Sequence, residues 1–537
     1  MLVHLVLIGL LVPSLVWACC DRHVWPWDQA WYAETAINLS LICRRHWDQW
    51  LAAMLHAMPT KPPAIAWFGQ LFVPLGAAVH HIEPALLCSI LLSQFGTLYF
   101  IYLISKELFP ESCMFPLTGS LCSASMPLFV AMSHQFLVEA LQTFAVSYFY
   151  WIALKSWQWS ISKIASHLLL AGVIAMLAKF STPLFCFAPV IMTLIVVTRQ
   201  LSSRRRRLFR LDRSDVLRLV CGLFLGLMTS TWYAINFSTV WQQAREATIG
   251  NQALNYGHRD TFFQKFAYWL PSLFSNFGLP EFWCCLAVLA SWGLLRLIKQ
   301  SGWNHSHSAG FPYRLLAIIL ILEIILVLSM FSLIIPEEPR YLLPLLPSIV
   351  ILILLLFKIF DDLRIKQIMV VALFWQFCVV HAQAQGLILK DPRICPWLIP
   401  VCKDATKARL IDDIVKVTST RAACEPITVC GVDLPWLNYN SLSFYAVKNS
   451  LETEKRAYYL PLGYGETEDQ KVWLQIKNER ASYFISCDPS LVSIPTDAFN
   501  FLDRPILKKV SNSKEWKRVV LQPSPAVLIF HRTKDNI

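Results

Sequence analysis

The sequence has few charged residues and no metal-type cysteine pairs. Only 15% of its 537 residues are Asp, Glu, Lys or Arg, whereas about a quarter of an ordinary soluble domain is charged. This shortage excludes a soluble enzyme. The 16 cysteines include no Cys-x-x-Cys pair, and many lie inside apolar runs, where a free thiol behaves as a small hydrophobe. Internal repeats and low-complexity segments are also absent from the sequence.

The composition instead favours a membrane protein. Hydrophobic residues make up 56% of the chain and aromatic residues 13%, and apolar stretches of about 20 residues recur, the length that spans a bilayer as a helix. The formal net charge is +12, but the excess lies in short segments between apolar stretches, where Lys and Arg mark the cytoplasmic side. We therefore predict an all-α polytopic membrane protein and expect no nucleic-acid partner.

The apolar runs predict about eleven transmembrane helices. Met1 to Cys19 is predicted to be a membrane helix rather than a signal peptide, because it has no early Lys or Arg and contains Trp17. Residues 64–80 are apolar but broken by glycine and proline, which favours a helix lying along the membrane interface. The other runs of spanning length lie near 84–105, 116–133, 140–158, 164–178, 180–198, 216–236, 280–298, 315–335, 341–360 and 367–387.

The distribution of Arg and Lys predicts which side each loop faces. The segment Arg199 to Arg218 holds eight Arg, including Arg204 to Arg207, which indicates the cytoplasm; an anionic-lipid or nucleic-acid patch is the alternative. The basic loops at Lys106, Lys155 to Lys163, Arg296 to Arg314 and Asp361 to Lys366 fall on the same side. The other side receives residues 20–82, the turn at Glu139, the loop Phe237 to Lys265, the turn Pro336 to Arg340 and the C-terminal tail.

The sequence predicts two domains. Residues 1–387 form the transmembrane domain, with a large first outer loop at 20–83. Residues 388–537 regain charge and carry short β-rich runs at 427–432, 481–486 and 526–531, which predicts an extracytoplasmic α/β domain. Five cysteines of this domain are candidates for disulfides that sequence cannot pair; they are Cys395, Cys402, Cys424, Cys430 and Cys487.

The first outer loop contains a candidate catalytic acid and a candidate phosphate-binding lysine. Asp28 is surrounded by three tryptophans that favour the membrane interface, and a carboxylate held there is suited to act as a general base. Lys61 precedes two prolines that restrict its backbone, so it can hold a phosphate as a point charge. The alternatives are that Asp28 caps a helix over Ala30 to Leu41 and that Lys61 only extends toward the interface.

Four motifs together resemble a known family. Asp28-x-x-x-Tyr32, Lys61-Pro62-Pro63, Glu139 at a helix start and Arg340-Tyr341-Leu342-Leu343-Pro344 occur in the order found in the polytopic C-type (GT-C) glycosyltransferases. The chain is most similar to the branch of protein O-mannosyltransferases and the lipid A aminoarabinose transferase, over roughly residues 20–345. The resemblance implies a GT-C fold, with Asp28 as the base, Lys61 on the lipid phosphate and Glu139 as a second catalytic acid.

The chain departs from the family pattern at two positions. Gln29 stands where an acid often follows the first-loop Asp, and Glu139 replaces an Asp. Without the adjacent acid, a divalent cation would lack its preferred oxygen anions. We assign no cofactor or metal, and a divalent cation stays open. A helix-terminal carboxylate that only complements the helix dipole is the alternative for Glu139.

Further polar residues on the same side are candidates for the substrate site. Arg340 is the strongest candidate for a donor phosphate, because guanidinium groups match phosphate oxygens; an ion pair with Glu337 or Glu338 is the alternative. Lys179 is a minor candidate, and Glu323 is an intramembrane acid suited either to function or to a helix–helix hydrogen bond. The remaining candidates are Arg245 and Arg259 for the phosphate, and Tyr32, Tyr341 and His258 for the substrate.

The resemblance predicts a glycosyltransferase in the bacterial plasma membrane. Its donor would be a sugar on a polyprenyl phosphate, and a lipid, glycan or protein acceptor would attack at the outer face with inversion. A transporter or lipid flippase is the alternative class, although transporters usually place polar residues at mid-membrane. An inactive assembly partner is the third possibility. Membrane lipid is the other expected partner, and the sequence identifies neither the acceptor nor the sugar.

Overall fold

The computed structural model describes residues 1–112, 115–202, 212–299, 313–359, 363–419, 426–453, 457–463, 468–497, 499–521 and 526–533. Within them the chain forms two compact units. The helical unit comprises Met1–Cys19, Met54–Ile65 and Leu87–Pro400, and the sheet unit comprises Cys20–Ala53, Ala66–Leu86 and Val401–Ile537. The basic segment Arg204 to Arg207, most of the Arg296 to Arg314 loop, Asp361 and Cys424 lie outside the described residues.

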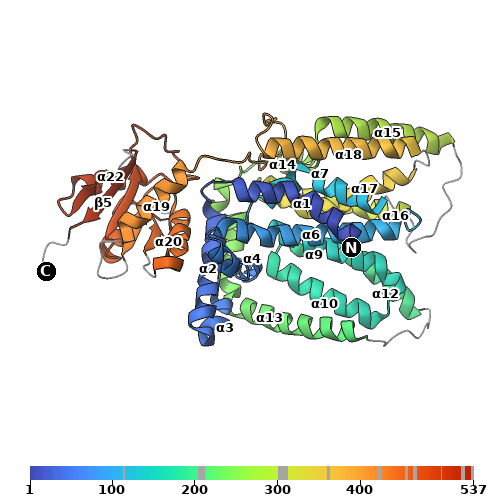
Figure 1. Cartoon of the computed structure of the whole chain (residues 1–537), viewed down its shortest axis with the longest axis horizontal. Helices are drawn as coiled ribbons and strands as arrows, with labels where there is room; N and C mark the ends of the chain where they lie inside the picture. Colours follow the sequence, from blue (N-terminus) through green and yellow to red (C-terminus); the bar gives the residue numbers. More distant parts are fainter. Residues whose placement is uncertain are drawn as a thin grey trace. The chain divides into compact units, whose positions relative to one another are not determined.

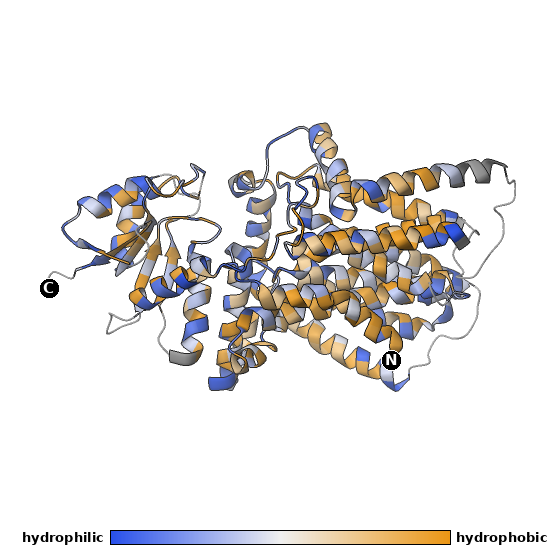
Figure 2. Cartoon of the chain, turned by 45° about the horizontal axis from the view of Figure 1, so that its top comes forward, coloured by the Kyte–Doolittle hydropathy of each residue, from blue (hydrophilic) through white to orange (hydrophobic). Residues whose placement is uncertain are grey.

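The chain is an integral multi-pass membrane protein. Seven stretches of the described residues are long and apolar enough to cross a membrane, or nine if each of two bent helix pairs counts as one crossing. The bent pairs are α7 (Phe115–Ser125) with α8 (Pro127–Ser133), at 70°, and α14 (Phe262–Phe277) with the first part of α15 (Pro280–Lys299), at 98°. The seven are α1 (Leu2–Cys20), α6 (Ile82–Leu108), α10 (Ile161–Ala178), α13 (Arg213–Thr248), α16 (Tyr313–Phe331), Pro339–Lys358 in η3 (Pro339–Leu345) and α17 (Leu346–Ile359), and Arg364–Ala384 in α18 (Leu363–Ala384). Apolar residues line these helices (Figure 2).

The predicted count of eleven spans is not confirmed. The runs expected at 140–158 and 180–198 fold as α9 (Glu139–Lys155) and α12 (Phe187–Ser202), which have only 17 and 16 residues. A helix of that length reaches about 24–26 Å at 1.5 Å per residue, less than a hydrocarbon core of about 30 Å. Hydropathy located the first segment to within about three residues, whereas in the second α12 begins at Phe187 and extends to Ser202, beyond the predicted end.

The first outer loop is folded rather than extended. It contains α2 (Trp27–Arg45), α3 (Trp47–His56), α4 (Ala64–Gly69) and α5 (Val73–Ala78). The single interfacial helix predicted over residues 64–80 is wrong, because α4 ends at Gly69 and a new helix begins at Val73 with a proline in its first turn, where proline is well tolerated.

The sheet unit contains five strands in the order β2-β1-β3-β5-β4. Strands β1 (Ile427–Cys430), β2 (Tyr458–Pro461) and β3 (Tyr483–Cys487) are parallel, whereas β5 (Val527–Arg532) is antiparallel to both β3 and β4 (Trp516–Val519). The three predicted runs became β1, β3 and β5. The sequence analysis missed β2 and β4, which are four-residue edge strands and so carry little periodicity.

The described helices of this C-terminal region are α19 (Thr406–Ser419), α20 (Tyr439–Thr453), α21 (Asp469–Asn478) and α22 (Asp503–Asn512). Figure 1 shows the sheet, with β5 labelled, beside α22 and α19. Its core includes Val429, Phe484, Ile506 and Phe530, all buried. Among the described cysteines of the predicted disulfide set, Cys395, Cys402, Cys430 and Cys487 are free thiols.

Residues from the first outer loop belong to the same compact unit as the sheet. Helix α2 packs along α20, and Trp25, just before α2, stacks on Phe444 with ring centroids 5.4 Å apart. The Ser441 hydroxyl donates to the Trp25 carbonyl at 2.7 Å, and the Cys402 N–H donates to the Asp21 carboxylate at 2.9 Å. The segment that carries Asp28 is therefore fixed by residues about 400 positions later in the sequence.

Asp503 is a buried acid in the sheet unit. It opens α22 with no exposed surface, and its Oδ1 accepts a hydrogen bond from the Ser486 hydroxyl at 2.7 Å. Burial raises its pKa to about 7, although the Ser486 bond and the charge of Arg504 oppose that change. A carboxyl group in this position keeps its proton more readily than one in water.

Candidate functional site

Glu139 is the centre of a buried charge cluster in the helical unit. It is the first residue of α9 and is 2% exposed. Its Oε1 lies 3.0 Å from Lys179 Nζ and 3.8 Å from Arg340 Nε. A buried carboxylate is expensive without such partners, so the two cations allow the acid to remain charged there.

Three separate elements bring these charges together. Lys179 directly follows α10, and its backbone N–H closes the last turn by donating to the Ala175 carbonyl. Arg340 lies in η3, which packs against the start of α9. Glu139, Lys179 and Arg340 each lie at the end of a helix. The helix therefore fixes the backbone position from which each charged side chain extends.

Aromatic rings complete the cluster. The Lys179 ammonium lies 4.0 Å from the centroid of the Tyr341 ring, and the Arg340 guanidinium lies 4.9 Å from the Trp397 ring. Such cation–π contacts hold a cation in place without neutralising it. Arg340 also lies 3.6 Å from the Glu338 carboxylate, so the ion pair considered as its alternative is present, with Glu338 as the partner.

The cluster favours anionic groups. Burial by itself would raise the pKa of Glu139, but Lys179 and Arg340 outweigh it and the pKa lies below its ordinary value. Burial is the largest cause of the lowered pKa of Lys179, and the nearby charge of Lys61 lowers it further. Among the described residues, Glu139 Oε2 has no hydrogen-bond partner. Lys61, Lys179 and Arg340 together can neutralise a phosphate, and the buried Oε2 of Glu139 retains the capacity to accept a hydrogen bond.

The turn before Arg340 is firmly held. Lys265 of α14 is 3% exposed, and its ammonium donates to the Ile335 carbonyl at 2.6 Å and lies 3.2 Å from the Glu337 carboxylate. The Glu337 N–H donates to the Tyr256 carbonyl at 2.8 Å. A Cβ on Gly257 would lie 2.1 Å from the Ile335 carbonyl oxygen. Only glycine therefore allows the segments around Gly257 and Ile335 to approach so closely.

Asp28 and Tyr32 belong to the sheet unit. Asp28 is the second residue of α2, and the N-cap is Pro26, which makes no side-chain cap. The alternative that Asp28 caps a helix starting near Ala30 is therefore wrong; the acid lies in the first turn, where it complements the helix dipole. Tyr32 follows one turn later and is 3% exposed.

The other predicted phosphate and substrate residues lie on the surface. Arg245, in the last turn of α13, is exposed, as are His258 and Arg259. In the described part of the chain, none of the three forms an ion pair with Glu139. His258 and Arg259 directly follow Gly257, which contacts the turn before Arg340. Arg245 lies three residues before Thr248, whose carbonyl accepts a hydrogen bond from the Ile335 N–H at 2.9 Å.

Comparison with known proteins identifies the architecture. The structure of ArnT from Cupriavidus metallidurans bound to undecaprenyl phosphate aligns over 99% of this chain and 98% of its own, with a TM-score of 0.57 at 12% identity. The chain has the GT-C fold of polytopic membrane glycosyltransferases. ArnT from the same organism in the apo state aligns over 98% and 97% of the two chains, with a TM-score of 0.54 at 12% identity. Residues 60–211 match the family described as dolichyl-phosphate-mannose-protein mannosyltransferase. A comparison with curated proteins found no match.

In this chain with the GT-C fold, the sequence analysis made Lys179 only a minor candidate for the site. The lysine between two apolar runs is the nearest cation to Glu139, and its one signal was a charge interrupting a long hydrophobic tract. Glu323 has the structural role that was the alternative. It is 1% exposed and accepts hydrogen bonds from the hydroxyls of Tyr150 and Ser348, which join α16 to α9 and α17.

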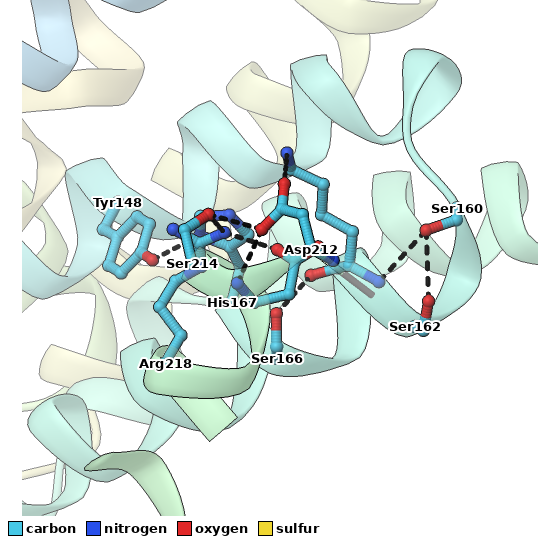
Figure 3. A network of polar contacts seen from close by, with 10 residues as sticks. Tyr148, Ser160, Ser162, Ser166, His167, Asp212, Ser214 and Arg218 are labelled. Carbon is cyan, nitrogen blue, oxygen red and sulfur yellow. Dashed lines mark hydrogen bonds and ion pairs between the residues drawn. The ribbon is translucent and has the colours of Figure 1, made fainter. Parts of the chain in front are cut away.

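A second polar network of the helical unit also has a structural role (Figure 3). Asp212 and Asp215 form a capping box at the start of α13, and Ser214 donates to Asp212 at 2.6 Å. Lys163 of α10 lies 3.8 Å from Asp212. These contacts satisfy a helix terminus and fasten α13 to α10. Among the described residues, no three His, Cys, Asp or Glu side chains are grouped to hold a metal ion.

Proposed function

We propose that the protein is a glycosyltransferase that moves a sugar from a polyprenyl phosphate to an acceptor hydroxyl or amine. The observation that carries the proposal is the buried cluster in which Glu139 lies between Lys179 and Arg340, with Lys61 near enough to affect it. The GT-C fold and the family match over residues 60–211 support the same chemistry. ArnT, which shares the fold, binds undecaprenyl phosphate, so a polyprenyl phosphate is the natural donor to test.

The cations act on the leaving group. As the acceptor oxygen forms its bond to the anomeric carbon, the bond to the phosphate oxygen breaks and its electron pair leaves with the phosphate. Lys61 and Arg340 stabilise that growing negative charge. Lys179 contributes a further positive charge, next to Glu139. One preorganised electrostatic group of this kind is commonly worth about 3 kcal/mol of barrier.

Asp28 removes the acceptor proton. A carboxylate in the first turn of α2 can accept that proton as the new bond forms. Attack opposite the departing phosphate inverts the anomeric centre. Glu139 supports the site through its buried Oε2, which has no hydrogen-bond partner among the described residues. The proposed substrate contacts are Tyr32, Tyr341 and His258, and the weaker phosphate contacts are Arg245 and Arg259.

The membrane location follows from the donor. A polyprenyl tail stays in the bilayer, so the sugar is presented at the membrane surface. The charge distribution of the loops supports an extracytoplasmic location for this surface, and the resemblance favours the bacterial plasma membrane. The lipid-linked donor and membrane lipid are the partners; the acceptor can be a lipid, a glycan or a protein.

A radiolabelled polyprenyl-phosphate sugar tests the proposal directly. Purified protein in vesicles is incubated with this donor and candidate acceptors, and label on the acceptor or released sugar is measured. Asp28→Asn should abolish transfer while the protein still inserts into the membrane. Movement of the donor across the bilayer without chemistry would instead identify a flippase, and neither activity would identify an assembly partner. The position of the charge cluster at helix ends favours the transferase.

A further inference from the structure

The loop that carries the proposed base is attached to the C-terminal domain at the residue next to Asp28. The Trp27 indole N–H donates a hydrogen bond to the Asp433 carboxylate, 406 positions away in the sequence. Both residues belong to the sheet unit. A hydrogen bond to a charged acceptor is stronger than one to a neutral acceptor, so this contact can fix the position of Trp27.

Trp27 needs such a contact because its backbone is strained. Its φ is +39°, in the left-handed region that bulky residues rarely adopt. Strained backbone persists only where the surrounding structure holds it, and it occurs often at functional sites. The strained residue is the first of α2, and Asp28 is the second, so the conformation of Trp27 sets the direction in which the Asp28 side chain leaves the helix.

Asp433 is itself rigidly placed. Its backbone N–H donates to Asn500 Oδ1 at 2.8 Å, and its carbonyl accepts from Asn500 Nδ2 at 3.2 Å. Asn500 is 3% exposed, and it also donates to Asp497 at 2.9 Å. Trp25 is held nearby through its carbonyl and its ring. The chain is thus held at Trp25 and Trp27, immediately before the acid.

We propose that Asp433 is a positioning residue for the reaction: through its hydrogen bond to Trp27, the C-terminal domain orients Asp28 toward the acceptor. This inference rests on the proposed function of Asp28 as the base. It gives the C-terminal domain a part in the chemical step. Because Asp28 acts on the acceptor, the contact should affect turnover and leave donor binding unchanged.

Variants on both sides of the contact test the inference. Asp433→Leu and Trp27→Phe each remove the hydrogen bond, so kcat should fall by about tenfold to a hundredfold, as for other misplaced catalytic groups, with the donor KM unchanged. The double variant should be no worse than either single one. Asp433→Asn keeps an oxygen acceptor and should retain most of the activity. Asp413→Asn, which alters a surface acid of α19, is the matched control.

Hydrogen exchange measured by mass spectrometry on the full-length protein gives a readout that does not depend on transfer. Peptides covering residues 27–33 should exchange about tenfold faster in Asp433→Leu and Trp27→Phe than in the wild type or in Asp413→Asn, because the first turn of α2 opens locally. Unchanged exchange, or faster exchange with unchanged kcat, would overturn the inference. Failure of the proposed function itself would appear differently, as a wild-type protein that transfers no sugar.

Discussion

Replacing Glu139 by Gln should destabilise the protein and make its stability depend on lipid phosphate. The substitution keeps the shape of the side chain but leaves Lys179 and Arg340 without the carboxylate that lies 3.0 and 3.8 Å away. Two unit charges about 4 Å apart interact by about 4 kcal/mol at an effective dielectric constant of 20. Removing one partner of a buried pair costs about 3–5 kcal/mol once desolvation is included. Because Glu139 is 2% exposed, solvent does not screen this loss.

A bound phosphate should restore much of that stability. The uncovered cations attract an anion more strongly than in the wild type, and a ligand that binds only the folded state stabilises it. Thermal unfolding in detergent, with and without undecaprenyl phosphate, measures both effects. Glu107→Gln is the control. The Glu107 carboxylate lies 2.6 Å from the ammonium of Lys155, the last residue of α9, and its side chain is more exposed than that of Glu139. It should lose less stability and gain nothing specific from the lipid. A Glu139→Gln protein as stable as the wild type, or one indifferent to the lipid, would refute the electrostatic reasoning.

Three further predictions follow from the same contacts. Lys61→Ala should raise the donor KM by about tenfold to a hundredfold, the effect of losing one charge-assisted bond of about 1.5–3 kcal/mol, with kcat less affected; steady-state kinetics with varied donor check this, and an unchanged KM would remove Lys61 from phosphate binding. Lys265→Met should also raise the donor KM, because it frees the turn that holds Arg340. The same increase in Glu337→Gln would support an effect transmitted through this turn, whereas normal donor kinetics in both variants would exclude it. The difference in unfolding free energy between Asp503→Asn and the wild type should favour the variant more at pH 8 than at pH 4.5. The folded-state pKa of Asp503, about 7, is above its unfolded value, so the wild type loses stability as pH rises toward 7. At about 1.4 kcal/mol per pH unit this loss is about 3 kcal/mol. Unfolding curves at the two pH values decide the last case, and a pH-independent difference would contradict it.

The sequence predicted the class of architecture because apolar length is a strong signal. The runs that became α1, α6, α10 and α16 were located from hydropathy alone. The count failed where helices were short or bent, as in α9 and the α7–α8 pair, because hydropathy does not detect a break in the helix axis.

The candidate site was only partly predictable. Glu139 and Arg340 were predicted as site residues on family motifs, and the structure pairs them; their catalytic roles remain predictions. Lys179 was underrated because a lysine between two apolar runs is also what an ordinary helix end contains. The contact between Trp27 and Asp433 could not have been found, since nothing in a single sequence links two residues 406 positions apart.

The long separation of Trp27 from Asp433 has a consequence for biosynthesis. At roughly 5–20 residues per second, a ribosome needs about 20–80 seconds to add the 406 residues between them. During that interval, α2 has been synthesised but the Asp433 carboxylate that accepts the hydrogen bond of its first residue has not. With Asp28 as the proposed base and Asp433 as its proposed positioning residue, transfer would begin only after the C-terminal domain has been synthesised and folded, so an incomplete polypeptide would be inactive.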